Sequence, residues 1–101
     1  MNAIVDQNIE KVNYWSDMLT AMANEHRLRI LARLVKQETS VTDLHQILGA
    51  RQSAVSQHLA VLRKAGLVKL RRDAQRIYYS CDNDAAIQIM EAIADGTGWT
   101  D

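Results

Sequence analysis

The sequence predicts a mainly α-helical protein with one small β-hairpin, and three observations support this fold class. Apolar residues recur at steps of three and four through 8–66 and again through 83–95, as they do on amphipathic helices. Between these regions, 67–81 is rich in β-branched and aromatic residues on either side of a short polar turn. With 101 residues, the chain has the length of a single domain, 1–101.

The first two expected helices differ in how their apolar residues are arranged. The first, 8–23, has a single apolar stripe, which either packs inward or forms a subunit contact with Trp15 as its anchor. The stripe consists of Ile9, Val12, Trp15, Leu19 and Met22. The second helix is capped by Asn24 and should end near Lys36 or Gln37. It is apolar nearly all round, so we expect it at the centre of the core.

The third and fourth expected helices are short and are joined by a tight turn. Ser40, with Asp43 three residues later, is a helix start signal, and Gly49 is a stop signal. The buried side of the third helix should contain Val41, Leu44, Ile47 and Leu48. The fourth helix begins near Arg51 or Ser53, a choice that the sequence leaves open, and ends at Gly66. Two such helices form a helix-turn-helix.

Two strands, 67–72 and 76–81, and a last helix complete the chain. Tyr78 and Tyr79 alternate across the second strand, so one of them should enter the core. Asp82 or Asn83 caps a helix that runs to about Asp95, and 96–99 should be a loose tail. The element order α-α-α-α-β-β-α is that of a winged helix-turn-helix domain.

The last helix is apolar over most of its circumference and needs more cover than a small monomer provides. We therefore expect a homodimer in which the terminal helices, 8–23 and 83–95, form the interface. The predicted interface residues are Ile9, Val12, Trp15, Leu19, Ile87, Met90 and Ile93.

Charge is distributed unevenly along the chain, although the formal net charge is zero. Residues 51–79 hold seven basic residues and one acidic residue, a net charge of +6. The segments 1–50 and 80–101 carry net charges of −1 and −5. A basic segment between acidic flanks is typical of a surface that binds phosphates. The sequence therefore predicts double-stranded DNA as a partner.

The fourth helix carries amides and hydroxyls first and cations later on the side opposite Val55, Leu59 and Leu62. Amides and hydroxyls can hydrogen-bond to base edges, whereas cations suit phosphates. The predicted base contacts are Gln52, Ser53, Ser56 and Gln57. The predicted phosphate or minor-groove contacts are Arg51, His58, Arg63, Lys64, Arg71, Arg72, Gln75 and Arg76.

The positions of the three histidines are predicted less specifically than those of the polar residues on the fourth helix. A hydrogen-bonded, partly buried His58 is as strong an expectation as a phosphate contact. His26 and His45 have no second His or Cys at ligand spacing, and we expect them on the surface.

Three segments resemble the ArsR/SmtB family of bacterial winged-helix repressors. They are AMANEHRLRIL (21–31), SAVSQHLAVLRKAGLV (53–68) and RRDAQRIYYS (71–80). The last is similar to the NolR/BigR/HlyU branch, and the resemblance covers roughly 19–93. It implies a homodimer that binds a palindromic, inverted-repeat operator and blocks transcription.

The chain departs from the sensor motifs of that family. Metal-sensing members carry Cys-Val-Cys where this chain has Ser40-Val41-Thr42, and its last helix lacks the His of their second site. Zinc prefers nitrogen and sulfur ligands, so we expect no metal site. The redox-responsive branch uses one cysteine on the second helix and another near the C-terminus. This chain has Ala32 at the first position and no cysteine in its tail, so no dithiol switch is expected.

Cys81 is the sole cysteine and is expected to be a small buried hydrophobe. The alternative is a repressor switched through this thiol, or a disulfide between subunits, which requires exposure and a lowered pKa. A further alternative is a winged-helix protein-interaction module that does not bind DNA.

Several other classes of protein are not expected. The chain has no Gly-rich phosphate loop and no supported catalytic triad or carboxylate pair, so we expect neither an enzyme nor a cofactor. It has no signal-peptide pattern and no run of about 18 apolar residues, so we expect a cytoplasmic protein without membrane contact. The sequence contains no pattern that identifies a small-molecule inducer.

Overall fold

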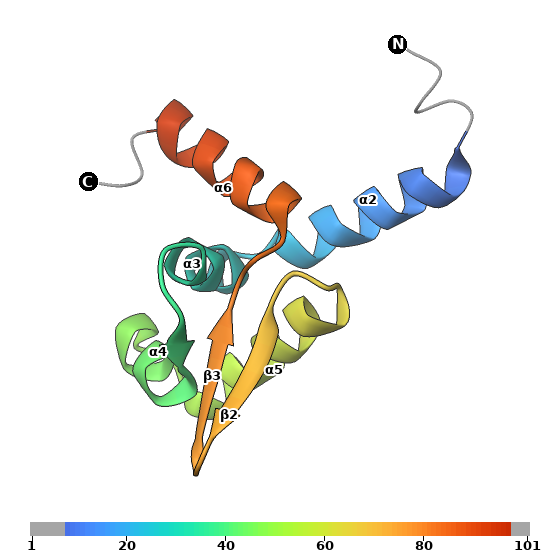
Figure 1. Cartoon of the computed structure of the whole chain (residues 1–101). Helices are drawn as coiled ribbons and strands as arrows, with labels where there is room; N and C mark the ends of the chain where they lie inside the picture. Colours follow the sequence, from blue (N-terminus) through green and yellow to red (C-terminus); the bar gives the residue numbers. More distant parts are fainter. Residues whose placement is uncertain (1–7, 98–101) are drawn as a thin grey trace.

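The computed structural model describes residues 8–97, which form five α-helices and three strands. The helices are α2 (Ile9–Met22), α3 (Glu25–Leu34), α4 (Val41–Leu48), α5 (Gln52–Lys64) and α6 (Asp84–Thr97). The strands are β1 (Thr39–Ser40), β2 (Lys69–Asp73) and β3 (Arg76–Ser80), in the antiparallel order β1-β3-β2. This is the winged helix-turn-helix order that the sequence predicts. Figure 1 shows the β2–β3 hairpin extending beside α4 and α5, with α2 and α6 at the other end.

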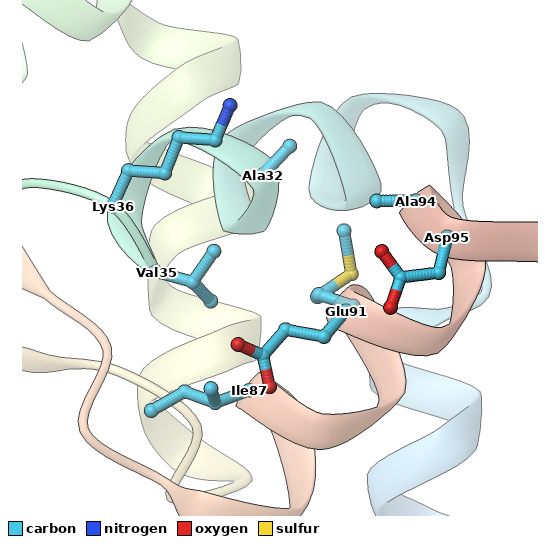
Figure 2. A pocket seen from close by; sticks show the side chains of 8 residues that line it. Ala32, Val35, Lys36, Ile87, Glu91, Ala94 and Asp95 are labelled. Carbon is cyan, nitrogen blue, oxygen red and sulfur yellow. The ribbon is translucent and has the colours of Figure 1, made fainter. Parts of the chain in front are cut away.

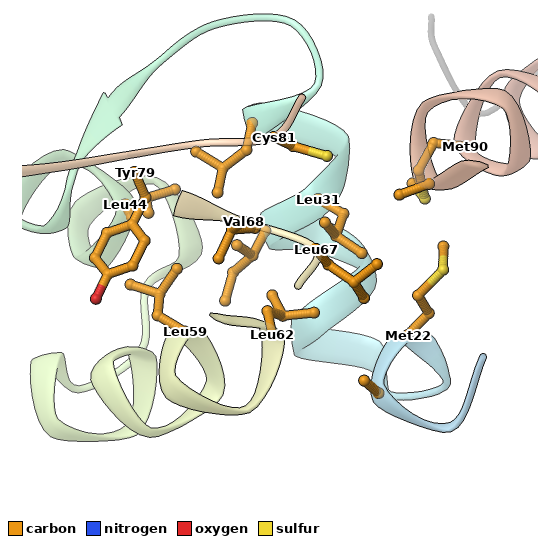
Figure 3. Close-up of a cluster of buried hydrophobic side chains, with 14 of the residues drawn as sticks. Met22, Leu31, Leu44, Leu59, Leu62, Leu67, Val68, Tyr79, Cys81 and Met90 are labelled. Carbon is orange, nitrogen blue, oxygen red and sulfur yellow. The ribbon is translucent and has the colours of Figure 1, made fainter. Parts of the chain in front are cut away.

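The core is aliphatic, as a chain without Phe requires. Its largest fully buried side chains come from α2, α3, α4, α5 and the segment that follows α5. They are Met18, Ile30, Leu31, Leu44, Val55, Leu59, Leu62 and Leu67. Figure 3 shows part of this cluster, to which Tyr79 of β3 and Cys81, the residue after β3, both contribute. The predicted central position of α3 is confirmed.

Short polar residues and a glycine set the helix ends. The side chains of Asn24 and Ser40 accept backbone N–H groups in the first turns of α3 and α4. Of the two candidate caps for α6, Asn83 does so, at 3.0 Å from Ala86 N. Gly49 ends α4 in the left-handed region, with φ of 66°. These ends confirm the expected caps and the expected stop.

Some boundaries differ from the expected ones. β1 was not predicted, because a two-residue strand has no periodicity; it pairs with Tyr78 and Tyr79. β2 begins at Lys69 because the two preceding residues turn into the core. Helix α3 ends at Leu34, two residues early, and α6 continues to Thr97, so the expected loose tail was wrong for 96–97. Residues 98–99 of that tail lie outside the described residues.

Two apolar positions are more exposed than their spacing suggests. Ile47 was expected in the core, but 49% of it is exposed, because its neighbours Leu44 and Leu48 fill the side of α4 that packs inward. The stripe on α2 also divides: Met22 is buried, whereas Ile9, Trp15 and Leu19 are 69%, 44% and 49% exposed. Inward packing is therefore wrong for most of this stripe.

Among the described residues, no helix combines the length and apolar character needed to cross a membrane.

Candidate nucleic-acid interface

The turn between α4 and α5 fixes how α5 is presented. Gly49 supplies the left-handed residue, and His45 Nδ1 bonds the carbonyl oxygen of Ala50 across the turn. Arg51 is the N-cap of α5, and its side chain makes no capping hydrogen bond. Of the two starts that the sequence leaves open, the structure therefore shows the one at Arg51, and Ser53 lies inside the first turn.

Helix α5 has one buried face and one exposed polar face. Val55, Leu59 and Leu62 are buried and hold the helix against the core. The four predicted base-contacting residues, Gln52, Ser53, Ser56 and Gln57, are all exposed on the other side. Their side chains make no hydrogen bond within the described part of the chain, so their donors and acceptors have no intramolecular partner there. The last turn adds the exposed cations Arg63 and Lys64.

The wing, residues 69–80, has two faces set by the alternation of its strands. Leu70 lies opposite Tyr79 and Arg72 opposite Ile77, so Arg72 shares the face that turns towards the core and α5. Arg71 lies opposite Tyr78 on the outer face. The tip is a two-residue turn of Ala74 and Gln75, between Asp73 and Arg76, and Arg72, Gln75 and Arg76 are exposed there.

Arg71 differs from the other predicted phosphate contacts, because a carboxylate already holds it. Its Nε and Nη2 donate to the two oxygens of Glu38 at 3.0 and 2.8 Å. The guanidinium lies 4.6 Å from the ring centroid of Tyr78. The hydrogen bond from Arg71 lowers the pKa of Glu38, so this carboxylate stays charged at neutral pH.

His58 lies between α5 and α3 rather than on the exposed face. Arg27 Nη1 donates to His58 Nδ1 at 3.4 Å, and the His58 ring stacks on His26 with centroids 5.3 Å apart. Burial, followed by the charge of Arg27, lowers the pKa of His58. These contacts favour the partly buried histidine over the phosphate contact. The expectation of surface positions was wrong for His26 and His45, which are both half-buried.

Cys81 is buried, with 8% of its surface exposed, which confirms the expected small hydrophobe. Burial raises the pKa of its thiol, whereas a reactive thiol needs exposure and a lowered pKa. These observations do not favour a switch through Cys81. Among the described residues, no group of three or more His, Cys, Asp and Glu side chains is arranged to hold a metal ion.

A cavity of about 180 Å³ lies between α3 and α6, and no residue of α5 or the wing lines it. Figure 2 shows Ala32 and Val35 on one side and Ile87, Glu91 and Ala94 on the other. Ala32, where the resemblance implies a redox cysteine in related proteins, lines this cavity, and Cys81 does not.

The predicted dimer residues fall into two groups. On α2, Ile9, Trp15 and Leu19 are exposed large hydrophobic side chains, and Val12 is half-buried. On α6, Ile87 and Ile93 are half-buried, but Met90 is only 3% exposed and belongs to the chain's own core. Met90 therefore has almost no surface left to bury against a partner, and its assignment to the interface is corrected.

The sequence did not predict that Glu38 binds Arg71 of the wing. Its partner lies 33 residues further along the chain, and no spacing pattern connects the two. The one available signal was charge, because Glu38 is an acidic residue immediately before the segment that pairs with β3.

Comparison with known proteins gives a consistent result. Residues 24–69 match the model of a family described as "Bacterial regulatory protein, arsR family". The nodulation protein NolR of Rhizobium meliloti is 45% identical over 95 residues, which are 94% of this chain and 78% of that protein. The transcriptional activator HlyU of Vibrio cholerae is 45% identical over 76 residues, which are 75% of this chain and 70% of HlyU. The crystal structure of NolR from Sinorhizobium fredii superimposes with a TM-score of 0.84 at 43% identity, covering 97% of this chain and 98% of that one.

Proposed function

The chain belongs to the arsR family of bacterial regulatory proteins, and from this premise we propose that it represses transcription as a homodimer bound to an inverted-repeat operator. It is a DNA-binding transcriptional regulator with a winged helix-turn-helix fold. We propose which residues contact DNA, that two chains form the bound dimer, and that binding represses transcription.

The observation that carries the proposal is the exposed face of α5. Gln52, Ser53, Ser56 and Gln57 offer amide and hydroxyl groups without partners in the described chain, on a helix that a buried face holds in place. We assign these side chains to base edges in the major groove. An amide such as that of Gln57 matches the donor and acceptor pair of adenine.

Cations at both ends of this face suit the phosphates on either side of the groove. Arg51 precedes α5, and Arg63 and Lys64 form its last turn. At the wing tip, Arg72, Gln75 and Arg76 are exposed beyond the strands and suit the adjacent minor groove or its phosphates.

The exposed stripe on α2 supports the dimer. Three large apolar side chains exposed along one helix cost free energy in water and are typical of an interaction surface. A shallow groove beside Trp15 and Leu19 provides a surface for the helices of a second copy. A twofold dimer should place its two recognition helices about 34–36 Å apart, one turn of DNA, which requires an inverted repeat.

Repression follows in this proposal from occupancy, because a dimer on two adjacent major grooves excludes other proteins from the DNA it covers. The relative HlyU is named an activator, so the direction of regulation needs its own measurement.

In vitro selection from random double-stranded DNA tests the proposal. We expect an enriched inverted repeat with half-sites about one turn apart, bound by two chains. Arg63→Ala should weaken binding, whereas Lys11→Ala, which removes an equal charge from exposed α2, should not. In vitro transcription from a promoter containing the repeat should fall as protein is added. A single half-site in the selected DNA would contradict the dimer, and increased transcription would contradict repression.

A further inference from the structure

We infer that Glu38 is a positioning residue of the wing: it holds Arg71 across the outer face of the sheet and thereby fixes where Arg72 and Arg76 meet the DNA. The inference rests on the proposed DNA-binding function and adds to it a residue outside the helix-turn-helix and the hairpin. It also removes Arg71 from the set of phosphate contacts that the sequence predicts.

The contacts of Arg71 define one conformation of its long side chain. Two parallel hydrogen bonds join its guanidinium to both carboxylate oxygens of Glu38, at 2.8 and 3.0 Å. The planar guanidinium fork matches a carboxylate in this geometry and loses less freedom than Lys would. The ring of Tyr78 lies beneath the guanidinium at 4.6 Å, and Asp73 lies 3.9 Å away on the same strand.

The position of this pair in the sheet gives it a mechanical role. Glu38 immediately precedes β1, Arg71 lies on β2, and β3 runs between them. In the strand register, Tyr78 of β3 pairs with Ser40 on one side and with Arg71 on the other. The Glu38–Arg71 pair therefore crosses all three strands and ties the hairpin to the segment that leads into α4.

Apart from this pair, the hairpin is held by the packing of Leu70, Ile77 and Tyr79 near its base and by the pairing of β3 with a two-residue strand. The wing tip projects beyond the core, with 71–76 exposed throughout. A small rotation of the hairpin about its base moves the tip furthest, so a tie across the sheet determines where the tip cations lie.

Charge pairing separates the four cations of the wing into two groups. Glu38 binds Arg71, and Asp82 binds Lys69 at 2.8 Å. Arg72 and Arg76 have no carboxylate within ion-pair distance in the described chain. Both members of the Glu38–Arg71 pair are partly exposed, so the pair contributes little to global stability, and its effect is on the position of the wing.

The test compares Glu38→Gln, Arg71→Gln and the double variant with Asp82→Asn as the matched control. Asp82→Asn removes an ion pair of the same hairpin that does not cross the sheet. Binding to the selected operator is measured over a series of salt concentrations. Hydrogen exchange of amides 72–76 is measured in the free proteins.

We expect each single variant to lose about fivefold in affinity, and the double variant to lose no more, because both changes remove one interaction. The slope of log affinity against log salt should stay unchanged, since no phosphate contact is lost. Amides 72–76 should exchange faster in these variants and at the wild-type rate in Asp82→Asn.

Three results would overturn the inference. A slope reduced by about 0.9 in Arg71→Gln would make Arg71 a phosphate contact. Tighter binding with a steeper slope in Glu38→Gln would make Glu38 a competitor of DNA for Arg71. If the wild type binds no DNA at all, the proposed function fails, while hydrogen exchange still decides the inference: equal rates at 72–76 in Glu38→Gln and Asp82→Asn would refute it.

Discussion

Helix α5 and the wing, the two regions that we propose contact DNA, are held in the fold in different ways. A fully buried face fixes α5, and its exposed amides and hydroxyls make no side-chain hydrogen bond in the described chain. The wing is exposed along most of β2 and at its tip and is partly buried along β3, and one of its cations is bound to Glu38. Discrimination among bases requires a rigid element with uncommitted side chains, whereas phosphate binding needs only charge held at the correct distance.

The largest expected difference between the two regions is in stability. Leu59→Ala in α5 should cost about 2–5 kcal/mol, because the side chain is fully buried and leaves a cavity. Leu70→Ala in the wing should cost about 1 kcal/mol, since this side chain is only half-buried. Urea unfolding followed by circular dichroism measures both. Equal costs would show that the wing is as much a part of the core as α5.

A wing cation should affect all DNA sequences alike. Arg72→Gln should cost about 1–2 kcal/mol of binding free energy on the selected operator and on random DNA, with the salt slope reduced by about 0.9. Fluorescence anisotropy at several salt concentrations gives both values, with Lys11→Gln as the control of equal charge. A loss confined to the operator would instead make Arg72 a base contact.

The two turns that present these regions should respond in opposite ways to exchange of glycine and alanine. Gly49, before α5, has φ of 66°, and an added Cβ meets no atom within 4 Å. Gly49→Ala should therefore cost about 1 kcal/mol from backbone strain alone. At the wing tip Ala74 has φ of 55°, so Ala74→Gly should stabilise the protein by about 0.5 kcal/mol. Thermal unfolding distinguishes the two signs, and destabilisation by both changes would contradict the argument.

The smallest expected effect concerns the anchoring of α5 on α3. Burial and Arg27 hold the pKa of His58 below its usual 6.5, so the unfolded chain binds the proton more readily than the folded one. This contribution to stability is present above pH 6.5 and is lost as pH falls towards the folded pKa. His58→Gln should flatten that part of the dependence of unfolding free energy on pH. An unchanged dependence of unfolding free energy on pH would show that protonation of His58 does not affect stability.

Local signals predicted the elements well. Asn24, Ser40 and Gly49 mark helix ends because caps and left-handed glycines act within a few residues. The periodicity of Val55, Leu59 and Leu62 predicted which face of α5 is buried, and thereby which face is available for DNA. For α5 and the hairpin, local chemistry was sufficient to predict the fold.

Contacts between distant segments could not be predicted in this way. The Glu38–Arg71 pair depends on the register of three strands, one of which is too short to show a pattern. His58 stacks on His26 because α3 crosses α5 at that point, a packing angle that spacing along one helix does not encode. Ile47 likewise has helical spacing suited to the core but lies where α4 has no neighbour to cover it.

The most direct test of the central claim, that the polar face of α5 selects the DNA sequence, is to compare Gln57→Ala with the wild type on two DNA duplexes. Anisotropy titrations on the selected inverted repeat and on a scrambled duplex of equal length give both affinities at one salt concentration. The account predicts a loss of about 1–3 kcal/mol on the repeat and an unchanged affinity on the scrambled duplex. An equal loss on both duplexes would contradict it, because Gln57 would then contribute to affinity without reading any base.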